Sequence, residues 1–231
     1  MKKRILIINP NSSEKMTADI RASSEYAIDD EFGVEVISMK GVPEALESFN
    51  DYTLAGAEIC KYISENQING TLNADGIIIS CVGDPGLFGA KEICKVPVIG
   101  VAEAALSTAL LLGGKFSILA ASEKAKPMME WMVLGYGLND RMASVETLSC
   151  NIDALINDKE KLCTLLQASC KRAQSNGADV LVLGCAGMTM VSDQSEEISS
   201  IPIIDPVKAG IENLKGIIRA NFKVSKSGLY A

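Results

Sequence analysis

The feature that most constrains this chain is an internal repeat, in which the second half of the sequence echoes the first. The matched pairs, each 104 residues apart, are Asp75 and Asp179, Cys81 and Cys185, and Gly83 and Gly187. In both copies an apolar run lies between the aspartate and the cysteine, which indicates a buried strand that ends next to a thiol. The repeat therefore predicts two similar lobes related by a pseudo-twofold axis, with one cysteine at the same point of each.

Both halves alternate short apolar runs with stretches of helical periodicity. The expected strands are residues 4–8, 33–38, 76–80, 97–101, 115–120, 144–148, the run before Cys185, and 201–204. The longer expected helices are residues 14–28, 53–69, 102–112, 152–176, 190–199 and 207–220. Such alternation is typical of right-handed βαβ units with parallel sheets. We predict an α/β fold of two pseudo-symmetric lobes, each a flavodoxin- or Rossmann-like parallel sheet flanked by helices, formed by residues 1–97 with 206–231 and by residues 98–205.

The strand tips are the expected location of the active site. Ligands of open α/β sheets bind outside the C-terminal ends of the strands. Cys81 and Cys185 both follow such ends. Pseudo-twofold symmetry would direct both tips into the cleft between the two lobes, so we expect the active site there.

Composition and charge limit the classes of partner. The 231 residues are 48% hydrophobic and 22% charged, which is typical of a globular protein. The net charge of −7 disfavours nucleic acid, and no stretch is long enough to span a bilayer. The apolar run near the N-terminus has four residues, too few for a secretory signal, and seven cysteines is an odd number that suits a reducing compartment. We expect a cytoplasmic homo-oligomer that acts on a small-molecule substrate.

The chain contains no histidine, and this restricts its catalytic chemistry. Ser-His-Asp and Cys-His schemes are excluded, as is every zinc site that uses histidine. No two cysteines have the Cys-x2-4-Cys spacing of a four-cysteine zinc site, so we expect no metal. A catalytic base must therefore be a cysteine, aspartate, glutamate, lysine or tyrosine.

Two of the seven cysteines stand apart from the others. An isolated cysteine is usually a small buried hydrophobe, and this interpretation suits those in or beside helical patterns: Cys60, Cys94, Cys150, Cys163 and Cys170. Cys81 and Cys185 instead follow apolar strands at matched points of the repeat, each with a glycine two positions later. From the residues alone, packing and chemistry are equally good interpretations of this pair.

The chemistry that suits a pair of thiols is proton transfer at an acidic C–H next to a carbonyl group. A thiolate accepts the proton from one face while a thiol donates one from the other, and the centre inverts. The helices expected to begin after each cysteine would help to lower the thiol pKa. The turns whose backbone N–H groups could stabilise the developing enolate are Asn11–Ser12, Val82–Gly83, Ser122 and Ala186–Gly187. The first of these turns is equally well explained as a helix N-cap.

Four motifs, taken together, point to a known family. They are Asn-Pro-Asn-Ser-Ser from Asn9, Cys-Val-Gly-Asp-Pro-Gly-Leu from Cys81, Pro-Val-Ile-Gly-Val-Ala-Glu-Ala-Ala from Pro97, and Gly-Cys-Ala-Gly-Met from Gly184. With these motifs, which span about residues 4–210, the chain resembles the aspartate/glutamate/hydantoin racemase superfamily. It looks most like the hydantoin and allantoin racemase branch.

The resemblance implies a racemase that needs no cofactor and uses two cysteines as its bases. The matching positions are Cys81 and Cys185 for the catalytic thiols, and Asn11, Gly83, Gly187 and Ser122 for substrate-contacting turns. Two departures leave the substrate open. Ala121-Ser122 stands where relatives usually have threonines, and Asp205-Pro206 stands where Asp-Gly is common.

Several alternatives remain at this point. Within the superfamily, an aspartate or glutamate racemase and a maleate isomerase would also use two cysteines. An arylmalonate-type decarboxylase needs only one, so the intact pair counts against it. The alternative from another class is a two-lobed protein that binds a small molecule without converting it.

Overall fold

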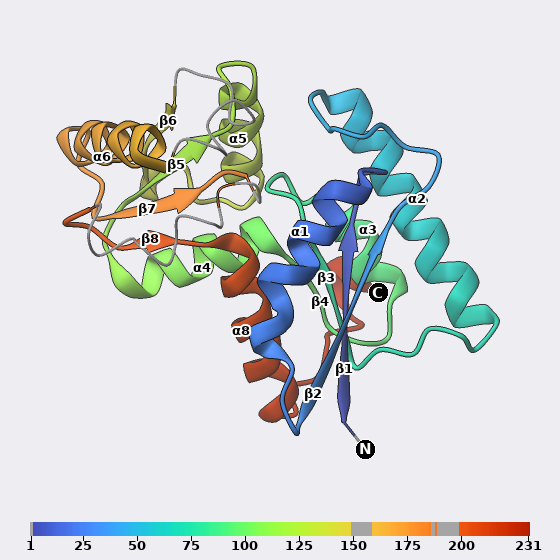
Figure 1. The fold of residues 1–231 in the computed structure, drawn as a ribbon. Coiled ribbons are helices and arrows are strands. Elements are labelled where there is room, and N and C mark those ends of the chain that lie inside the picture. The colour runs from blue at the N-terminus through green and yellow to red at the C-terminus, as the bar shows by residue number, and fades with distance from the viewer. Residues whose placement is uncertain (1, 149–158, 186–187, 189–198) are drawn as a thin grey trace. The chain divides into compact units, whose positions relative to one another are not determined.

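The structure, a computed structural model, describes residues 2–148, 159–185, 188 and 199–231. The chain divides into two compact units (Figure 1), Met1–Val101 with Gly210–Ala231 and Ala102–Ala209. The unit boundaries thus fall after Val101 and Ala209, compared with 97 and 205 in the division drawn from the sequence. Among the described residues, no helix combines the length and the apolarity that a membrane span requires.

The first unit is built on a four-stranded parallel sheet with the order β2-β1-β3-β4. Its strands are β1 (Lys3–Asn9), β2 (Phe32–Ser38), β3 (Gly76–Ile79) and β4 (Val98–Gly100). Its helices are α1 (Glu14–Ser24), α2 (Phe49–Ile68), α3 (Leu87–Ile93), the C-terminal part of α8 (Pro206–Arg219), and the 3-10 turns Glu25–Ala27 and Gly228–Tyr230. In Figure 1, α1 and α8 lie on one side of the strands and α2 and α3 on the other.

Serine caps fix where the first two helices begin. The Ser13 hydroxyl accepts a hydrogen bond from the Met16 N–H (3.2 Å), and Ser48 accepts one from the Asp51 N–H (3.1 Å). Because Ser48 supplies this cap, α2 begins at Phe49, four residues before the helix expected at 53–69. The helix expected over 14–28 ends instead at Ser24 and tightens into a 3-10 turn.

The last helix returns to complete the first unit. Pro206 is the first residue of α8, where its missing N–H costs nothing, and Asp205 directly before it accepts from the Val207 N–H (2.7 Å). Near the other end of α8, Lys215 is 4% exposed and donates to Asp29 (3.2 Å). The Lys215 ammonium also lies 5.1 Å from the centre of the Phe32 ring.

The second unit repeats this design with the order β6-β5-β7-β8, again all parallel. Its strands are β5 (Phe116–Ala120), β6 (Met142–Thr147), β7 (Val180–Leu183) and β8 (Ile203–Ile204). Its helices are α4 (Val101–Leu112), α5 (Ala125–Gly135), α6 (Lys159–Ser175) and the 3-10 turn Asn139–Arg141. Of the helices expected at 152–176 and 190–199, residues 152–158 and 190–198 lie outside the described residues.

Equivalent hydrogen bonds from backbone N–H groups recur in the two units. At the start of the sheets, Asp75 accepts from the Arg4 N–H (2.8 Å) and Asp179 from the Lys115 N–H (3.0 Å). At the ends of β3 and β7, the Ser80 N–H donates to Ile8 O and the Gly184 N–H to Leu119 O, both at 2.9 Å. The sequence repeat is therefore a repeat of structure, and the prediction of two parallel α/β lobes is confirmed.

Candidate active site

Cys81 lies in a tight turn at the C-terminal edge of the first sheet, two residues beyond β3. The Asp84 N–H donates to Cys81 O (3.0 Å) and closes the turn. Cys81 is half-buried, whereas Val82 is 4% exposed. The helix expected to follow Asp84-Pro85-Gly86 begins at Leu87, so the turn separates Cys81 from the first residue of α3.

Tyr52 of α2 packs against the Cys81 turn. Its hydroxyl donates to Val82 O (3.4 Å), which holds the peptide between Val82 and Gly83. Gly83 has a φ of +154°, and a Cβ at this position would lie 2.5 Å from the tyrosine ring. Gly83 is thus where the sequence predicted a site residue, but the reason visible in the structure is its contact with Tyr52. Sequence reasoning missed Tyr52, because it lies far from the motif and just before the helix that was expected at 53–69.

Asn11 lies in a buried polar cluster that follows β1. Its carboxamide oxygen accepts from Asn9 Nδ2 (2.8 Å) and from the Ser13 N–H (3.0 Å), and its Nδ2 contacts the sulfur of Met16 at 3.0 Å. Asn9 Nδ2 also donates to Thr17 Oγ1 (3.0 Å). None of these side chains carries a charge. Because β1 and β3 are neighbouring parallel strands, this cluster and the Cys81 turn share one edge of the sheet.

Ser12 holds a neighbouring loop. Its hydroxyl donates to Val42 O (2.9 Å) and its backbone N–H to Pro43 O (3.1 Å). The Ser12 backbone N–H, which was expected to reach the substrate, is therefore engaged within the chain. A substrate contact at Ser12 stays a prediction.

Cys185 occupies the equivalent turn of the second unit. The Met188 N–H donates to Cys185 O (3.0 Å), as the Asp84 N–H does to Cys81 O in the first unit. Cys185 is half-buried and packs against the apolar cluster that contains Leu119 and Met188. The predicted contacts at Ala186 and Gly187 lie outside the described residues.

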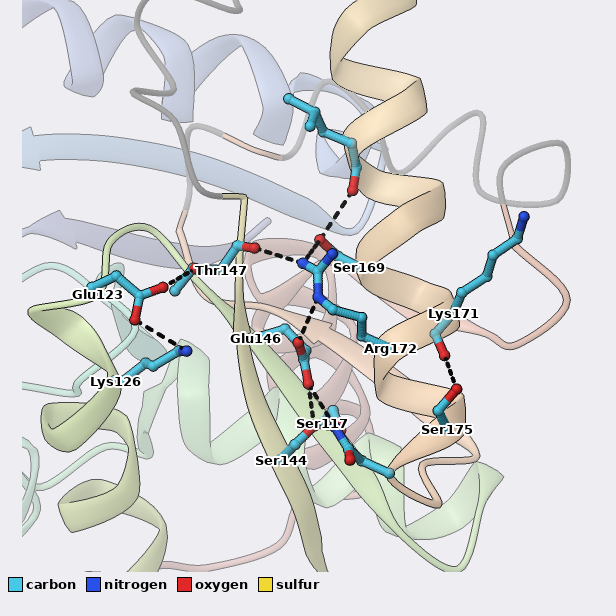
Figure 2. A network of polar contacts seen from close by, with 12 residues as sticks. Ser117, Glu123, Lys126, Ser144, Glu146, Thr147, Ser169, Lys171, Arg172 and Ser175 are labelled. Atoms are coloured by element: carbon cyan, nitrogen blue, oxygen red, sulfur yellow. Dashed lines mark hydrogen bonds and ion pairs between the residues drawn. The ribbon is translucent and has the colours of Figure 1, made fainter.

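Ser122 lies in the turn after β5, the strand next to β7. It is exposed, and its hydroxyl oxygen accepts from the Ala125 N–H (3.3 Å). The next residue, Glu123, accepts a hydrogen bond from Thr147 and pairs with Lys126 at 3.1 Å (Figure 2). The bonds from Thr147 and Lys126 lower the pKa of the Glu123 carboxyl below its usual value. The turn is therefore braced by an ionised side chain.

Other cysteines lie in packing positions. Burial raises the thiol pKa of Cys60, Cys94 and Cys170, and the last two are only 1% and 2% exposed. These thiols stay protonated at neutral pH and are poor bases. The six described cysteines are thiols rather than disulfides, and no three side chains of the described residues gather as ligands for a metal ion.

Comparisons with known proteins agree on one family. The model of the Asp/Glu/Hydantoin racemase family matches residues 5–214. The hydantoin racemase of Pseudomonas sp. (strain NS671) is 31% identical over 228 residues, which cover 98% of this chain and 90% of that protein. The hydantoin racemase of Paenarthrobacter aurescens is 30% identical, with 98% and 96% covered. Among solved structures, the allantoin racemase from Klebsiella pneumoniae superposes with a TM-score of 0.88 at 27% identity, covering 100% of this chain and 93% of that one.

Proposed function

The chain belongs to the Asp/Glu/Hydantoin racemase family, and from that premise we propose that it racemises a 5-substituted hydantoin or a related ureide such as allantoin. As a member of this family it is an isomerase of the racemase class. The curated relatives named hydantoin racemase and the structural neighbour named allantoin racemase support a ureide substrate.

The observation that carries the mechanism is the matched pair of thiols. Cys81 and Cys185 each lie two residues beyond the third strand of their unit, in turns closed by the same 3.0 Å backbone hydrogen bond. The chain has no histidine that could act as the base instead. In the proposed reaction both thiols act on one substrate carbon, from opposite faces.

The proposed step is a balanced proton exchange. The thiolate of one cysteine takes the proton from the ring carbon next to the carbonyl, and the C–H electron pair moves into that carbonyl to give an enolate. The thiol of the other cysteine donates its proton to the opposite face. The first cysteine ends as a thiol and the second as a thiolate, so the reverse reaction can follow, and no cofactor is required. Backbone N–H groups of the turns that carry the cysteines stabilise the enolate oxygen.

The neutral polar cluster beside the Cys81 turn favours a ureide over a dicarboxylate. Its amide and hydroxyl groups, from Asn9, Asn11 and Thr17, are polar and uncharged, like the N–H and C=O groups of a urea unit. Aspartate or glutamate would bring two carboxylates, which Arg or Lys side chains bind best. The cluster contains no such cation.

Solvent-deuterium incorporation tests the reaction class. Each pure enantiomer of a panel of hydantoins, allantoin, aspartate and glutamate is incubated in D₂O, and both optical rotation and exchange at the stereocentre are followed. We expect loss of rotation with one deuterium at that carbon for a hydantoin or allantoin, and the same rates after dialysis against a chelator. Exchange with aspartate or glutamate alone would move the assignment to an amino-acid racemase. The absence of both exchange and racemisation with every compound of the panel would refute the proposal.

The remaining expectations are part of the same proposal. The odd number of cysteines and the absence of disulfides among the six described ones favour a reducing cytoplasm. We propose that the enzyme works there as a homo-oligomer. Size-exclusion chromatography with light scattering would show a species larger than the 24.6 kDa chain.

A further inference from the structure

Positions 100 and 205 are equivalent in the repeat, yet one carries no side chain and the other a carboxylate. The β3–β4 register places Gly100 beside Ile79, and the β7–β8 register, which pairs Val182 with Ile204, places Asp205 level with the next residue of β7. The Asp205 carboxylate accepts from the N–H groups at the start of α8 (2.7 and 3.1 Å). In the second unit a carboxylate thus terminates the fourth strand.

In the first unit, Asp84 brings a carboxylate to that same position from a different place in the chain. A Cβ added to Gly100 would clash with the carboxyl group of Asp84. Asp84 is 7% exposed and has a φ of +44°, a conformation that is uncommon for residues other than glycine. The equivalent of Asp84 in the second unit is Met188, which is buried among apolar side chains. In the first unit the carboxylate therefore comes from the turn (Asp84), and the strand end is a glycine. In the second unit it comes from the strand end (Asp205), and the turn position is Met188.

We propose that Asp84 is the positioning residue for Cys81: its carboxylate fills the place of the side chain that Gly100 lacks and so fixes the Cys81 turn against the end of β4. The link is short, because the Asp84 N–H closes the turn on Cys81 O at 3.0 Å. Because Asp84 is buried, its carboxylate cannot be left without polar partners except at a high cost, and this holds its position. Position 100 is a glycine because the Asp84 carboxylate occupies the space that a side chain would need there.

This inference rests on the proposed function, since a position for Cys81 matters most if the thiol transfers a proton. Displacing a reacting group by about 1 Å can lower a rate on the order of 100-fold. We therefore expect Asp84 to act on the catalytic rate more than on substrate affinity.

The test moves the carboxylate from one position to the other. Three variants are compared: Asp84→Gly, Gly100→Asp, and the double variant, which has the arrangement of the second unit. Asp84→Gly should lower kcat about 10- to 100-fold with little change in KM. Gly100→Asp alone should also lose activity, because its carboxylate meets that of Asp84. The double variant should recover most of the loss. Losses that simply add in the double variant would overturn the proposal.

A second measurement does not depend on racemisation. The alkylation rates of Cys81 and Cys185 with iodoacetamide are followed by peptide mass spectrometry in each folded variant. Asp84→Gly should shift the Cys81 rate relative to that of Cys185, and the double variant should return it. If the glycine variant does not fold, Asp84→Asn replaces it, because asparagine suits the positive φ and keeps the side-chain volume. Asp84→Asn should also shift the alkylation rate of Cys81 relative to that of Cys185.

The matched control is Asp75→Asn at the opposite end of β3, where the carboxylate accepts from the Arg4 N–H (2.8 Å). This variant should lower the unfolding midpoint and leave the ratio of the two alkylation rates unchanged. An equal shift of the Cys81 rate in Asp75→Asn would overturn a positioning role for Asp84. A wild-type chain that racemises nothing would refute the proposed function alone, because the alkylation rates would still decide the role of Asp84.

Discussion

The polar groups that follow the first strand of the first unit are neutral, whereas an ion pair between Glu146 and Arg172 lies beside the sheet of the second. In the first unit, amides and hydroxyls from Asn9, Asn11 and Thr17 bond to one another. In the second, the carboxylate of Glu146 on β6 accepts from Arg172 Nε (3.0 Å), and Arg172 also donates to Thr147 O (2.8 Å), as Figure 2 shows. The backbone design is nevertheless the same in both units.

The comparison shows which features of the repeat are the same in both units and which differ. Backbone hydrogen bonds at the strand ends have the same lengths in both units, so they fix where each cysteine lies. The side chains beside the sheets differ: amides and hydroxyls follow β1 in the first unit, whereas β6 of the second carries Glu146, paired with Arg172. The two thiols therefore share a position in the fold without sharing an environment, and we expect them to differ in reactivity.

The largest expected effect comes from removing either thiol. Cys81→Ser and Cys185→Ser should each lower racemisation by about 10²- to 10⁴-fold, the usual contribution of a positioned acid or base. Circular dichroism of pure hydantoin enantiomers gives the rate, and deuterium exchange shows which enantiomer each remaining thiol still deprotonates. Retained racemisation in both variants would eliminate the two-base mechanism, and exchange from the same enantiomer in both would contradict thiols on opposite faces.

The charged network of the second unit should make its stability depend on acid. Burial alone would raise the pKa of Glu146, but hydrogen bonds from Ser144, Arg172 and Asn176 outweigh it and lower the pKa. Because the folded-state pKa is depressed, the stabilisation is present above the unfolded-state pKa, about 4.3. It is lost as the pH falls through the folded-state pKa. Glu146→Gln should cost about 1.5–3 kcal/mol at pH 7 and reduce the acid dependence of stability.

Urea unfolding from pH 7 downward measures both effects. Glu65→Gln, on the exposed surface of α2, is the matched control and should leave the acid dependence in place. An acid dependence that is as steep in Glu146→Gln as in the wild type would show that other carboxylates are responsible for it.

The neutral cluster of the first unit should contribute stability that does not vary over the same pH range. Asn9 is fully buried, and Asn9→Ala would leave the carbonyl of Asn11 and the hydroxyl of Thr17 without this partner, at a cost of about 1–3 kcal/mol. The loss should be equal at pH 7 and pH 5 by urea unfolding. A loss that grows with falling pH would break the contrast between the two units.

The smallest effect should come from making the two strand ends more alike. The hydroxyl of Ser80 is buried and has no hydrogen-bond partner among the described residues, and its counterpart in the second unit is Gly184. Ser80→Ala should therefore raise stability by about 1 kcal/mol, because it removes an unsatisfied polar group. Thermal unfolding measures the change, with Ser23→Ala on α1 as a control for a hydroxyl that does have a partner. A lower melting temperature in Ser80→Ala would show that the hydroxyl is needed.

Much of the fold and part of the candidate site could be predicted from the sequence. Strands with apolar β-branched runs, such as β1 and β3, lie where the pattern indicated, and the 104-residue interval marked both cysteine turns. The features that were missed depend on contacts between distant segments. Tyr52 reaches the Cys81 turn from α2, and Asp84 lies over Gly100 from another loop. Neither contact leaves a local signal, because the residues that meet are separated along the chain.

The path of the chain through the two units affects how it can fold during synthesis. The second unit, Ala102–Ala209, is continuous, whereas the first needs Gly210–Ala231 to finish its core. Gly76 of β3 packs against Leu214, and Lys215 against Asp29 and Phe32, so these early segments emerge from the ribosome long before their partners. Domains generally fold as units while the chain is made. The half that is translated first is therefore the last to be complete, and its exposed sheet face must wait for the final helix.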